Sequence, residues 1–316
     1  MSSANPPLRP RGRAGFTLIE LMVALVIMGL LTTALWQIVR SQSAFVASES
    51  QREDAQDNAR AAIDVLTGDL RAALPRGVIR AGNNELELAL PKAWGIACGG
   101  GSATSLTAVF PALPTDALTP TGNAAGLVVN TSATNTPDWT PRPAVGGARA
   151  FVTASAAADL AAAPCSAMGA QGAGLLAYQF TGTNFPVATA GQVVMLYQLV
   201  RYDVAQSDNK WWLRRSTGMD NTGTTFSMTP LAGPIPAQDS LRFTYYTGAT
   251  AALQNPAPGT TVATLDSLSR IKVKVVTQSS GQYQGRSNYE RDSSAVLLRN
   301  RVGSLQCSDG STGGPC

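Results

Sequence analysis

The hydrophobic residues near the start of the chain change their spacing once and divide a long predicted helix into two halves. Residues 16–36 read FTLIELMVALVIMGLLTTALW and are apolar on every side, with Glu20 as the one charge. Over 55–73 apolar residues instead recur at steps of three and four, and Pro75 ends the pattern. The spacing predicts a helix over 16–73, about 85 Å long, whose second half packs on a globular domain.

Beyond this helix, runs of β-forming residues alternate with turn-forming residues. Strands are predicted at Glu85–Leu90, Val193–Val204, Trp211–Arg215, Leu241–Tyr246, Ile271–Val276 and Ala295–Leu298. The second and third of these segments predict a hairpin around the polar linker 205–210. A long N-terminal helix laid against an antiparallel sheet is an α+β fold.

Composition divides the chain into three parts. Residues 1–15 form a short basic leader, 16–74 form the N-terminal helix, and 75–316 form a β-rich globular domain outside the cytoplasm. Within the last part, residues 99–190 are dominated by Ala, Gly, Thr, Ser and Pro, which predicts a long, partly irregular insertion. The short apolar pieces 127–129 and 150–152 in this insertion suit edge strands.

The residue inventory argues against an enzyme. The chain has no histidine, which removes His-based triads, His metal sites and His general bases. No Ser-Gly pair forms a nucleophile elbow, and the Asp-Asn turns lack the spacing of a calcium loop. We therefore expect no catalytic residue, no cofactor and no bound metal.

The positive charge of the chain gathers in its leader. The formal net charge is +4, and without Arg9, Arg11 and Arg13 it falls to +1. The basic balance is therefore poor evidence for nucleic-acid binding, which needs Lys and Arg on one face. Six later cations are candidates for such a face: Arg242, Lys272, Lys274, Arg286, Arg299 and Arg301. Lysines at alternate strand positions are typical of a solvated face, so nucleic acid is not expected as a partner.

The apolar run has the length of a membrane span. As a helix, residues 16–36 cover roughly 30 Å, the thickness of the hydrocarbon core of a bilayer. An ordinary secretory signal has a shorter apolar core and a small-x-small cleavage site after it. The basic leader places the N-terminus in the cytoplasm and the residues beyond the span on the other side.

Gly15 and Glu20 do not suit a plain membrane anchor. Gly15 lies just before the apolar run, where a protease can approach the backbone closely. Glu20 lies one helical turn into the lipid, where a carboxylate is costly and needs a partner. Cleavage after Gly15 would create an ammonium group on Phe16, four residues from Glu20. In a bundle of such helices, each Glu20 could neutralise the amine of a neighbour and set the register.

Residues 15–25, GFTLIELMVAL, resemble the signal of type IV pilins and type II secretion pseudopilins. The resemblance implies cleavage between Gly15 and Phe16 by prepilin peptidase, N-methylation of Phe16, and Glu20 as the assembly residue. It also implies the pilin fold and a chain that is the substrate of an enzyme. Major pilins usually carry a helix-kinking Pro in the second half of the apolar segment. None occurs between Phe16 and Leu74 here, which leaves Gly29 as the weak point.

Shorter segments elsewhere in the chain indicate which type of pilin the chain resembles. Residues 54–60 and 66–72, and Leu298–Arg301 near the end, are similar to PilW-type minor pilins. The J-type minor pseudopilin of type II secretion shares the helix pattern and a comparable hairpin. The resemblance implies a minor subunit that primes or caps a filament.

Four cysteines without C-x-x-C spacing indicate two disulfides in an oxidising compartment. Cys307 and Cys316 bracket a flexible spacer, and loop-closure entropy favours pairing them with each other. That pairing would join Cys98 to Cys165, and the other pairings remain open.

The sequence therefore predicts a minor type IV pilin, with other pilins, prepilin peptidase and the inner membrane as partners. The alternatives are a minor pseudopilin of a type II secretion system, and a pilin-displayed adhesin or DNA-uptake module. We expect the chain to span the inner membrane once before assembly and to lie in a pilus, at the cell surface or in the periplasm afterwards.

Overall fold

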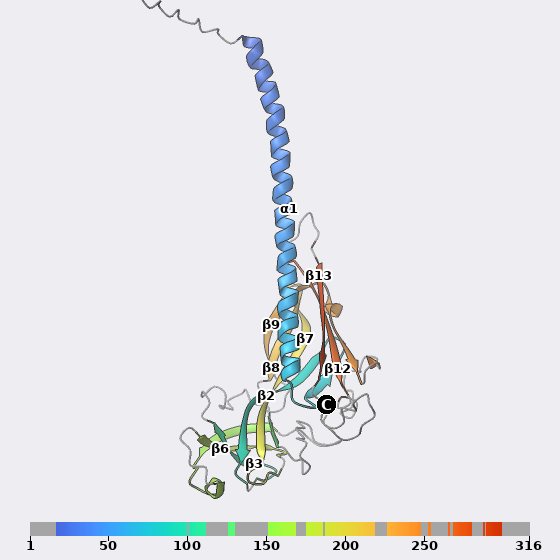
Figure 1. The fold of residues 1–316 in the computed structure, drawn as a ribbon. Helices are drawn as coiled ribbons and strands as arrows, with labels where there is room; N and C mark the ends of the chain where they lie inside the picture. The colour runs from blue at the N-terminus through green and yellow to red at the C-terminus, as the bar shows by residue number, and fades with distance from the viewer. Residues whose placement is uncertain are drawn as a thin grey trace, which may run out of the picture. The chain divides into compact units, whose positions relative to one another are not determined.

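A computed structural model describes most of the chain after the leader. It covers residues 17–99, 101–111, 126–129, 151–168, 175–185, 187–218, 226–247, 252–253, 265, 268–279, 287 and 289–298. One long helix is followed by antiparallel sheets, which confirms the predicted α+β fold (Figure 1). The chain divides within the helix, between Ser50 and Gln51, into two units that are described separately.

Helix α1 spans Leu18–Ala72 without interruption at Gly29. Within its second half, small and branched apolar residues fall on one buried stripe: Ala55, Ala59, Ala62, Ile63, Leu66 and Leu70. Alanines on such a stripe let the sheet backbone approach the helix closely, while Ile63, Leu66 and Leu70 fill the remaining space. The helix ends at Ala72, one residue before its predicted end at residue 73 and three residues before Pro75.

The larger sheet follows the order β5-β6-β3-β2-β7-β8-β9, with β1 paired to β2 and β4 paired to β7. Its strands are β1 (Val78–Ala81), β2 (Leu86–Ala97), β3 (Ser105–Pro111), β4 (Gly126–Val129), β5 (Phe151–Ala158), β6 (Leu175–Thr183), β7 (Val193–Ser207), β8 (Lys210–Gly218) and β9 (Phe226–Ile235). The long strands β2 and β7 pair with each other at the middle of this sheet. Strands β3, β6 and β5 lie on the β2 side, and strands β8 and β9 lie on the β7 side.

The smaller sheet follows the order β11-β10-β12-β13. Its strands are β10 (Leu241–Tyr246), β11 (Ala252–Leu253), β12 (Arg270–Gln278) and β13 (Tyr289–Leu297). Burial alternates strictly along β10 and β12, so one face is covered and the other is open.

One core joins the helix to both sheets. Leu66 and Leu70 of α1 belong to the same buried cluster as Leu88 of the larger sheet and Val273 of the smaller one. Figure 1 shows the second half of α1 beside strands of both sheets. The hydroxyl of Tyr245 also donates a hydrogen bond of 2.7 Å to the carbonyl of Gly82, which links β10 to the β1–β2 turn. The second half of the helix is thus fixed to the globular domain.

The predicted hairpin is present, but its turn is shorter than the linker 205–210. Strand β7 continues to Ser207 and β8 begins at Lys210, so Asp208 and Asn209 alone form the turn. Both have positive φ, 51° and 59°. Such a two-residue turn matches the twist of the flanking strands, and Asp and Asn tolerate this conformation better than most residues. The polar residues before it therefore remain in the strand.

The segment 99–190 contains more strand than its composition predicts. Its described parts hold β3, β4, β5 and β6, together with the short 3-10 helix η1 (Cys165–Met168). The expected piece 127–129 lies in β4, and residues 151–152 of the other piece lie in β5, whereas residue 150 lies outside the described residues. Strand β5 ends the order of the larger sheet. Their core centres on Phe110 and Phe180, whose ring centroids are 5.5 Å apart in an edge-to-face contact. These aromatic side chains stabilise strands that are otherwise rich in Ala, Ser and Thr.

Candidate functional site

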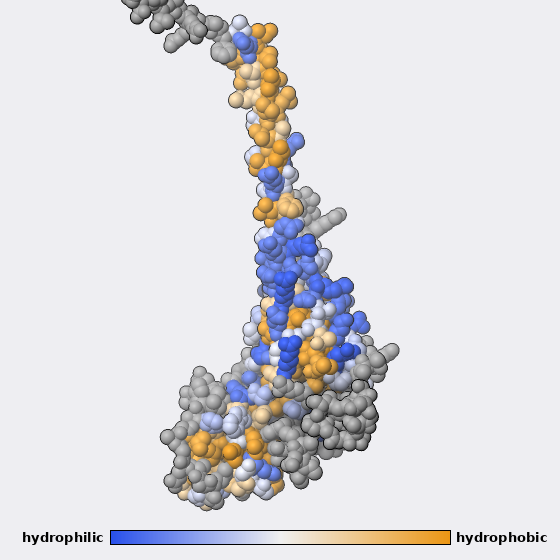
Figure 2. Space-filling view, in the orientation of Figure 1, coloured by the Kyte–Doolittle hydropathy of each residue, from blue (hydrophilic) through white to orange (hydrophobic). Residues whose placement is uncertain are grey.

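The first half of α1 presents apolar side chains on every side. All residues from Leu18 to Ser43 are exposed, including every large aliphatic side chain. Figure 2 shows this part of the helix as mainly hydrophobic. Within the described residues, α1 is long and apolar enough to cross a membrane. A surface of this size and kind requires lipid or other apolar helices as its cover.

Hydroxyl groups inside the apolar segment are satisfied by the helix itself. Thr32 donates a hydrogen bond of 2.7 Å to the carbonyl of Met28, and Thr33 donates one of 2.8 Å to the carbonyl of Leu30. In lipid an unpaired hydroxyl would cost free energy, because no water replaces the missing partner. These threonines therefore do not oppose burial of the segment.

Glu20 takes part in a capping box at the start of the helix. The backbone N–H of Glu20 donates to Oγ1 of Thr17 at 3.3 Å, and the backbone N–H of Thr17 faces Oε2 of Glu20 at 3.5 Å. Thr17 precedes the first helical residue, Leu18, and Glu20 is the third residue of the helix. This is the reciprocal pattern of a Thr-x-x-Glu box, and the carboxylate also lies at the positive end of the helix dipole.

The sequence carries this capping signal as Thr17-Leu18-Ile19-Glu20, but the partner expected for Glu20 was an amine of another chain. The contact that the carboxylate makes with Thr17 is long for a hydrogen bond. The capping role therefore leaves Glu20 free to accept a stronger partner. Gly15 and Phe16, the predicted processing residues, lie outside the described residues.

Asp69 on the second half of α1 connects the helix to the larger sheet. Its Oδ2 accepts a hydrogen bond of 2.5 Å from the hydroxyl of Tyr202 and one of 2.9 Å from Nε of Arg215. Burial, reinforced by the Asp69 carboxylate, raises the pKa of the Tyr202 hydroxyl well above its ordinary value. The hydroxyl stays neutral and donates its proton throughout the physiological range.

Two polar contacts connect the same half of the helix to the smaller sheet. Oγ1 of Thr277 donates a hydrogen bond of 2.6 Å to the carbonyl of Ala55, and both groups are buried. Nε of Arg52 lies 2.9 Å from Oε1 of Glu290 in an exposed ion pair. These contacts fix the second half of α1 to the smaller sheet.

The structure joins Cys98 to Cys165 in a disulfide across a sequence separation of 67. Cys98 follows β2, Cys165 begins η1, and both side chains are buried. The bond therefore closes the part of the chain that contains β3, β4 and β5. Cys307 and Cys316 lie outside the described residues, so their predicted pairing stays a prediction.

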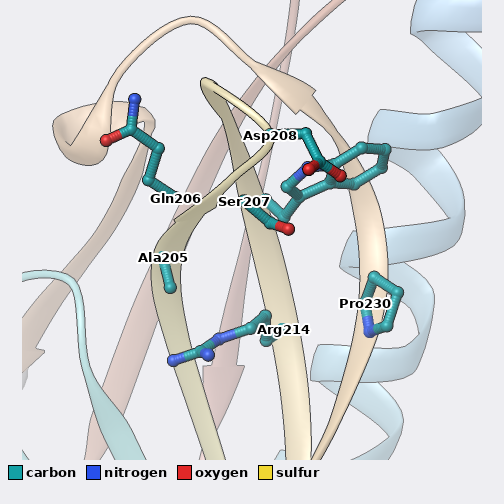
Figure 3. A pocket seen from close by; sticks show the side chains of 7 residues that line it. Ala205, Gln206, Ser207, Asp208, Arg214 and Pro230 are labelled. Carbon is teal, nitrogen blue, oxygen red and sulfur yellow. The ribbon is translucent and has the colours of Figure 1, made fainter.

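A shallow hollow of about 380 Å³ lies beside the β7–β8 turn (Figure 3). Its lining residues are Ala205, Gln206, Ser207, Asp208, Trp212, Arg214 and Pro230. Nε and an Nη of Arg214 each lie 2.8 Å from a carboxylate oxygen of Asp203, so the cation is already neutralised. Figure 3 shows Asp208 at the turn, well separated from Arg214. The hollow thus offers a largely apolar surface with one carboxylate at its edge.

Comparison with known proteins finds a family motif that includes residues 15–25, the segment that resembles the pilin signal. Residues 10–36 match the family model described as the prokaryotic N-terminal methylation motif. No curated protein and no solved structure matches the chain. The motif supports a type IV pilin- or pseudopilin-like protein, and it implies processing by prepilin peptidase and assembly with pilins in general. Together with the exposed apolar helix, it indicates membrane anchoring.

Proposed function

We propose that the chain is a minor type IV pilin, a structural subunit that primes or caps pilus assembly after cleavage between Gly15 and Phe16. The observation that carries the proposal is the position of Glu20 within the methylation motif, in the first turn of an exposed apolar helix. On this proposal the chain is a substrate of prepilin peptidase rather than an enzyme. Other pilins pack against its N-terminal helix.

The physical argument concerns the free-energy cost of placing the Glu20 carboxylate in lipid. A carboxylate in lipid is costly, and a loose contact with Thr17 offsets little of that cost. The N-terminal amine that cleavage would create on a neighbouring subunit supplies a full opposite charge in a low-dielectric environment. This pairing would favour assembly and would fix the stagger between adjacent helices.

The minor role is supported by features beyond the motif. The apolar segment contains no Pro, and α1 continues unbroken through Gly29. The helix carries a domain with two sheets, in which the segment 99–190 adds strands to one end of the larger sheet. A large domain of this kind suits a subunit at the end of a filament better than one repeated along its length.

Processing can be tested at Gly15. In cells that contain prepilin peptidase, the mature chain should begin at Phe16 with a methylated amine, as measured by mass spectrometry of the intact protein. Gly15→Leu should leave the precursor uncleaved, whereas Gly12→Leu, a matched change within the leader, should be cleaved normally. A mature chain of the same mass from Gly15→Leu would refute the cleavage site.

A pseudopilin of a type II secretion system is the alternative that the motif equally supports. Deleting the gene separates the two. A minor pilin predicts loss of surface pili with normal protein secretion, whereas a pseudopilin predicts accumulation of exported proteins in the periplasm with normal pili. Restoring the wild-type gene should restore the affected property.

A further inference from the structure

Strand alternation sorts the charged residues of the smaller sheet onto opposite faces. The outer face carries five cations, here called the basic face: Arg242, Arg270, Lys272, Lys274 and Arg291. The carboxylates of β13 point the other way, because Glu290 and Asp292 are paired in register with the buried Thr277 and Val275. Within β10, β12 and β13 the basic face therefore contains no acidic residue.

The five cations lie close together. Arg242 stands directly opposite Lys274 on the neighbouring strand, a like-charge pair that destabilises a sheet. Arg270, Lys272 and Lys274 occupy alternate positions of β12 and are spaced by about 6.7 Å along the strand. Because β12 is an interior strand, this row cannot be explained as charge that protects a sheet edge.

The positive charge of this face is not compensated within the described part of the chain. No carboxylate there forms an ion pair with any of the five cations. Arg242, Lys272 and Arg291 are exposed. The guanidinium of Arg270 lies 4.1 Å above the ring of Tyr246, a contact that orients the cation but leaves its charge intact. The charges of the basic face are therefore available to bind an anion that is not part of the described chain.

We infer that the basic face binds the phosphodiester backbone of a nucleic acid, without regard to sequence. A phosphodiester backbone presents a regular row of anions that carries no cations of its own, which matches the row on β12. Long Lys and Arg side chains contact phosphates and position a duplex, whereas sequence is recognised by contacts to base edges. Of the six cations that the sequence offers for such a face, the structure brings Arg242, Lys272 and Lys274 together and adds Arg270 and Arg291 from the same surface.

Two other polyanionic partners fit less well. The exposed side of α1 is the acidic surface that a second copy would offer, but there Arg60 interrupts the carboxylates of Glu53, Asp57 and Asp64. A lipid surface would require several apolar side chains to insert beside the cations. On the described basic face the exposed large hydrophobic side chains are Leu297 and Tyr289, which lie at opposite ends of β13 and form no continuous apolar patch.

The test measures binding of the full chain, solubilised in a neutral detergent, to a fluorescent 20-base-pair DNA duplex by anisotropy. Because Arg9, Arg11 and Arg13 would bind the same duplex, all proteins carry glutamine at these positions. The face variant is Lys272→Gln with Lys274→Gln. The control is Lys210→Gln with Arg60→Gln, which removes the same charge from exposed positions outside the face.

Binding should weaken with salt, with a slope of log K against log [salt] between about −4 and −5 for five phosphate contacts. The face variant should reduce the steepness by about 2, and the control should leave it unchanged. A second duplex of unrelated sequence should bind equally. Equal losses in the face variant and the control would overturn the inference.

Three further arms distinguish the source of the anion. Absence of duplex binding at 50 mM salt, a condition chosen to favour charge contacts, overturns the inference outright. Binding to phosphatidylglycerol vesicles without binding to the duplex also overturns the inference and would indicate that the basic face binds a lipid surface. Displacement of the duplex by polyglutamate at equal charge would indicate an acidic protein instead. None of these results depends on cleavage or filament assembly, because the solubilised chain is unassembled.

Discussion

The hydroxyl of Tyr202 and the carboxylate of Asp69 are joined by a hydrogen bond of 2.5 Å that links the larger sheet to helix α1 across 133 residues of sequence. Arg215, on the neighbouring strand, supplies a second donor to the same carboxylate oxygen at 2.9 Å. The three side chains hold the helix near its C-terminal end. Their removal should therefore loosen the attachment of the helix without affecting its apolar first half.

Asp69→Ala should lower the free energy of unfolding by about 2–3 kcal/mol, because it leaves a buried hydroxyl and a half-buried guanidinium without their acceptor. Tyr202→Phe removes one hydrogen bond to a charged group and should cost about 1–2 kcal/mol. Urea unfolding in neutral detergent, followed by tryptophan fluorescence, to which Trp211 and Trp212 on β8 contribute, measures both. The matched control Asp64→Ala, on the exposed side of the same helix, should stay within about 0.5 kcal/mol. Equal effects at Asp64 and Asp69 would contradict the anchoring role.

Alkaline pH should destabilise the globular domain through two buried tyrosines. Burial raises the pKa of both Tyr202 and Tyr245 well above the ordinary value of 10.0. Below pH 10 both the folded and the unfolded chain hold these protons, so stability does not change. Above pH 10 the unfolded chain releases them and the folded chain does not, so each tyrosine lowers the free energy of unfolding by about 1.4 kcal/mol per pH unit.

The measurement is urea unfolding between pH 9 and pH 11. Tyr245→Phe should make the decline above pH 10 shallower by the contribution of one tyrosine. Tyr289→Phe changes an exposed side chain and should leave the decline as in the wild type. A decline of the same steepness in Tyr245→Phe would show that this hydroxyl ionises as readily in the folded chain as in the unfolded one.

Helix α1 and strand β10 were predictable because their patterns are regular and uninterrupted. The apolar stripe over 55–73 leads directly to Pro75, and Leu241–Tyr246 alternates large β-forming residues with polar ones. Strand β9 escaped prediction because it contains Pro230 and Pro234, which the end of a sheet tolerates and its interior does not. Strands β3 and β6 escaped because their stability comes from packing around Phe110 and Phe180, which local composition does not reveal.

In the candidate site, too, the features that depend on local sequence were predictable and those that depend on long-range packing were not. The spacing of Gly15, Phe16 and Glu20 is local, so the sequence alone suggests their roles. The capping box was also local, and the Thr-x-x-Glu pattern at Thr17 could have revealed it. The contact between Asp69 and Tyr202, and the gathering of cations on one sheet face, depend on strand register and long-range packing. The alternation of Lys272 and Lys274 places these two on one face, but nothing in the neighbouring residues predicts the contact between Asp69 and Tyr202 or the addition of cations from β10 and β13.

Reduction of the Cys98–Cys165 disulfide should destabilise the end of the larger sheet that contains β3 to β6. The bond closes a loop with a sequence separation of 67, for which chain entropy gives about 4 kcal/mol. Cys98→Ser with Cys165→Ser should therefore unfold at lower urea than the wild type, and dithiothreitol should shift the wild type toward the variant. Addition of dithiothreitol to the variant should change its midpoint far less.

Peptide mapping without reduction checks the predicted pattern of cysteine bonds. It should recover one peptide pair that contains Cys98 and Cys165, and a second that contains Cys307 and Cys316. A peptide that joins Cys307 to Cys98 or Cys165 would contradict both the prediction for the C-terminal pair and the bond in the structure.

Thr17 and Glu20 allow the capping role of the carboxylate to be separated from its proposed role in assembly. Thr17→Ala removes the cap but keeps the charge, and it should cost about 1 kcal/mol of local helix stability. Glu20→Gln keeps a side chain that can complete the capping box but removes the charge. If pairing with a neighbouring amine drives assembly, Glu20→Gln should be cleaved normally yet be lost from the filament fraction, while Thr17→Ala is incorporated.

Quantitative immunoblotting of membrane and filament fractions measures this difference. Glu20→Asp provides the charge-preserving control and should retain part of the incorporation, because a shorter side chain reaches the amine less well. If Thr17→Ala and Glu20→Gln lose incorporation to the same extent, the cap rather than the charge matters. If neither variant loses it, the carboxylate plays no part in assembly, and the proposed stagger of adjacent helices must have another origin.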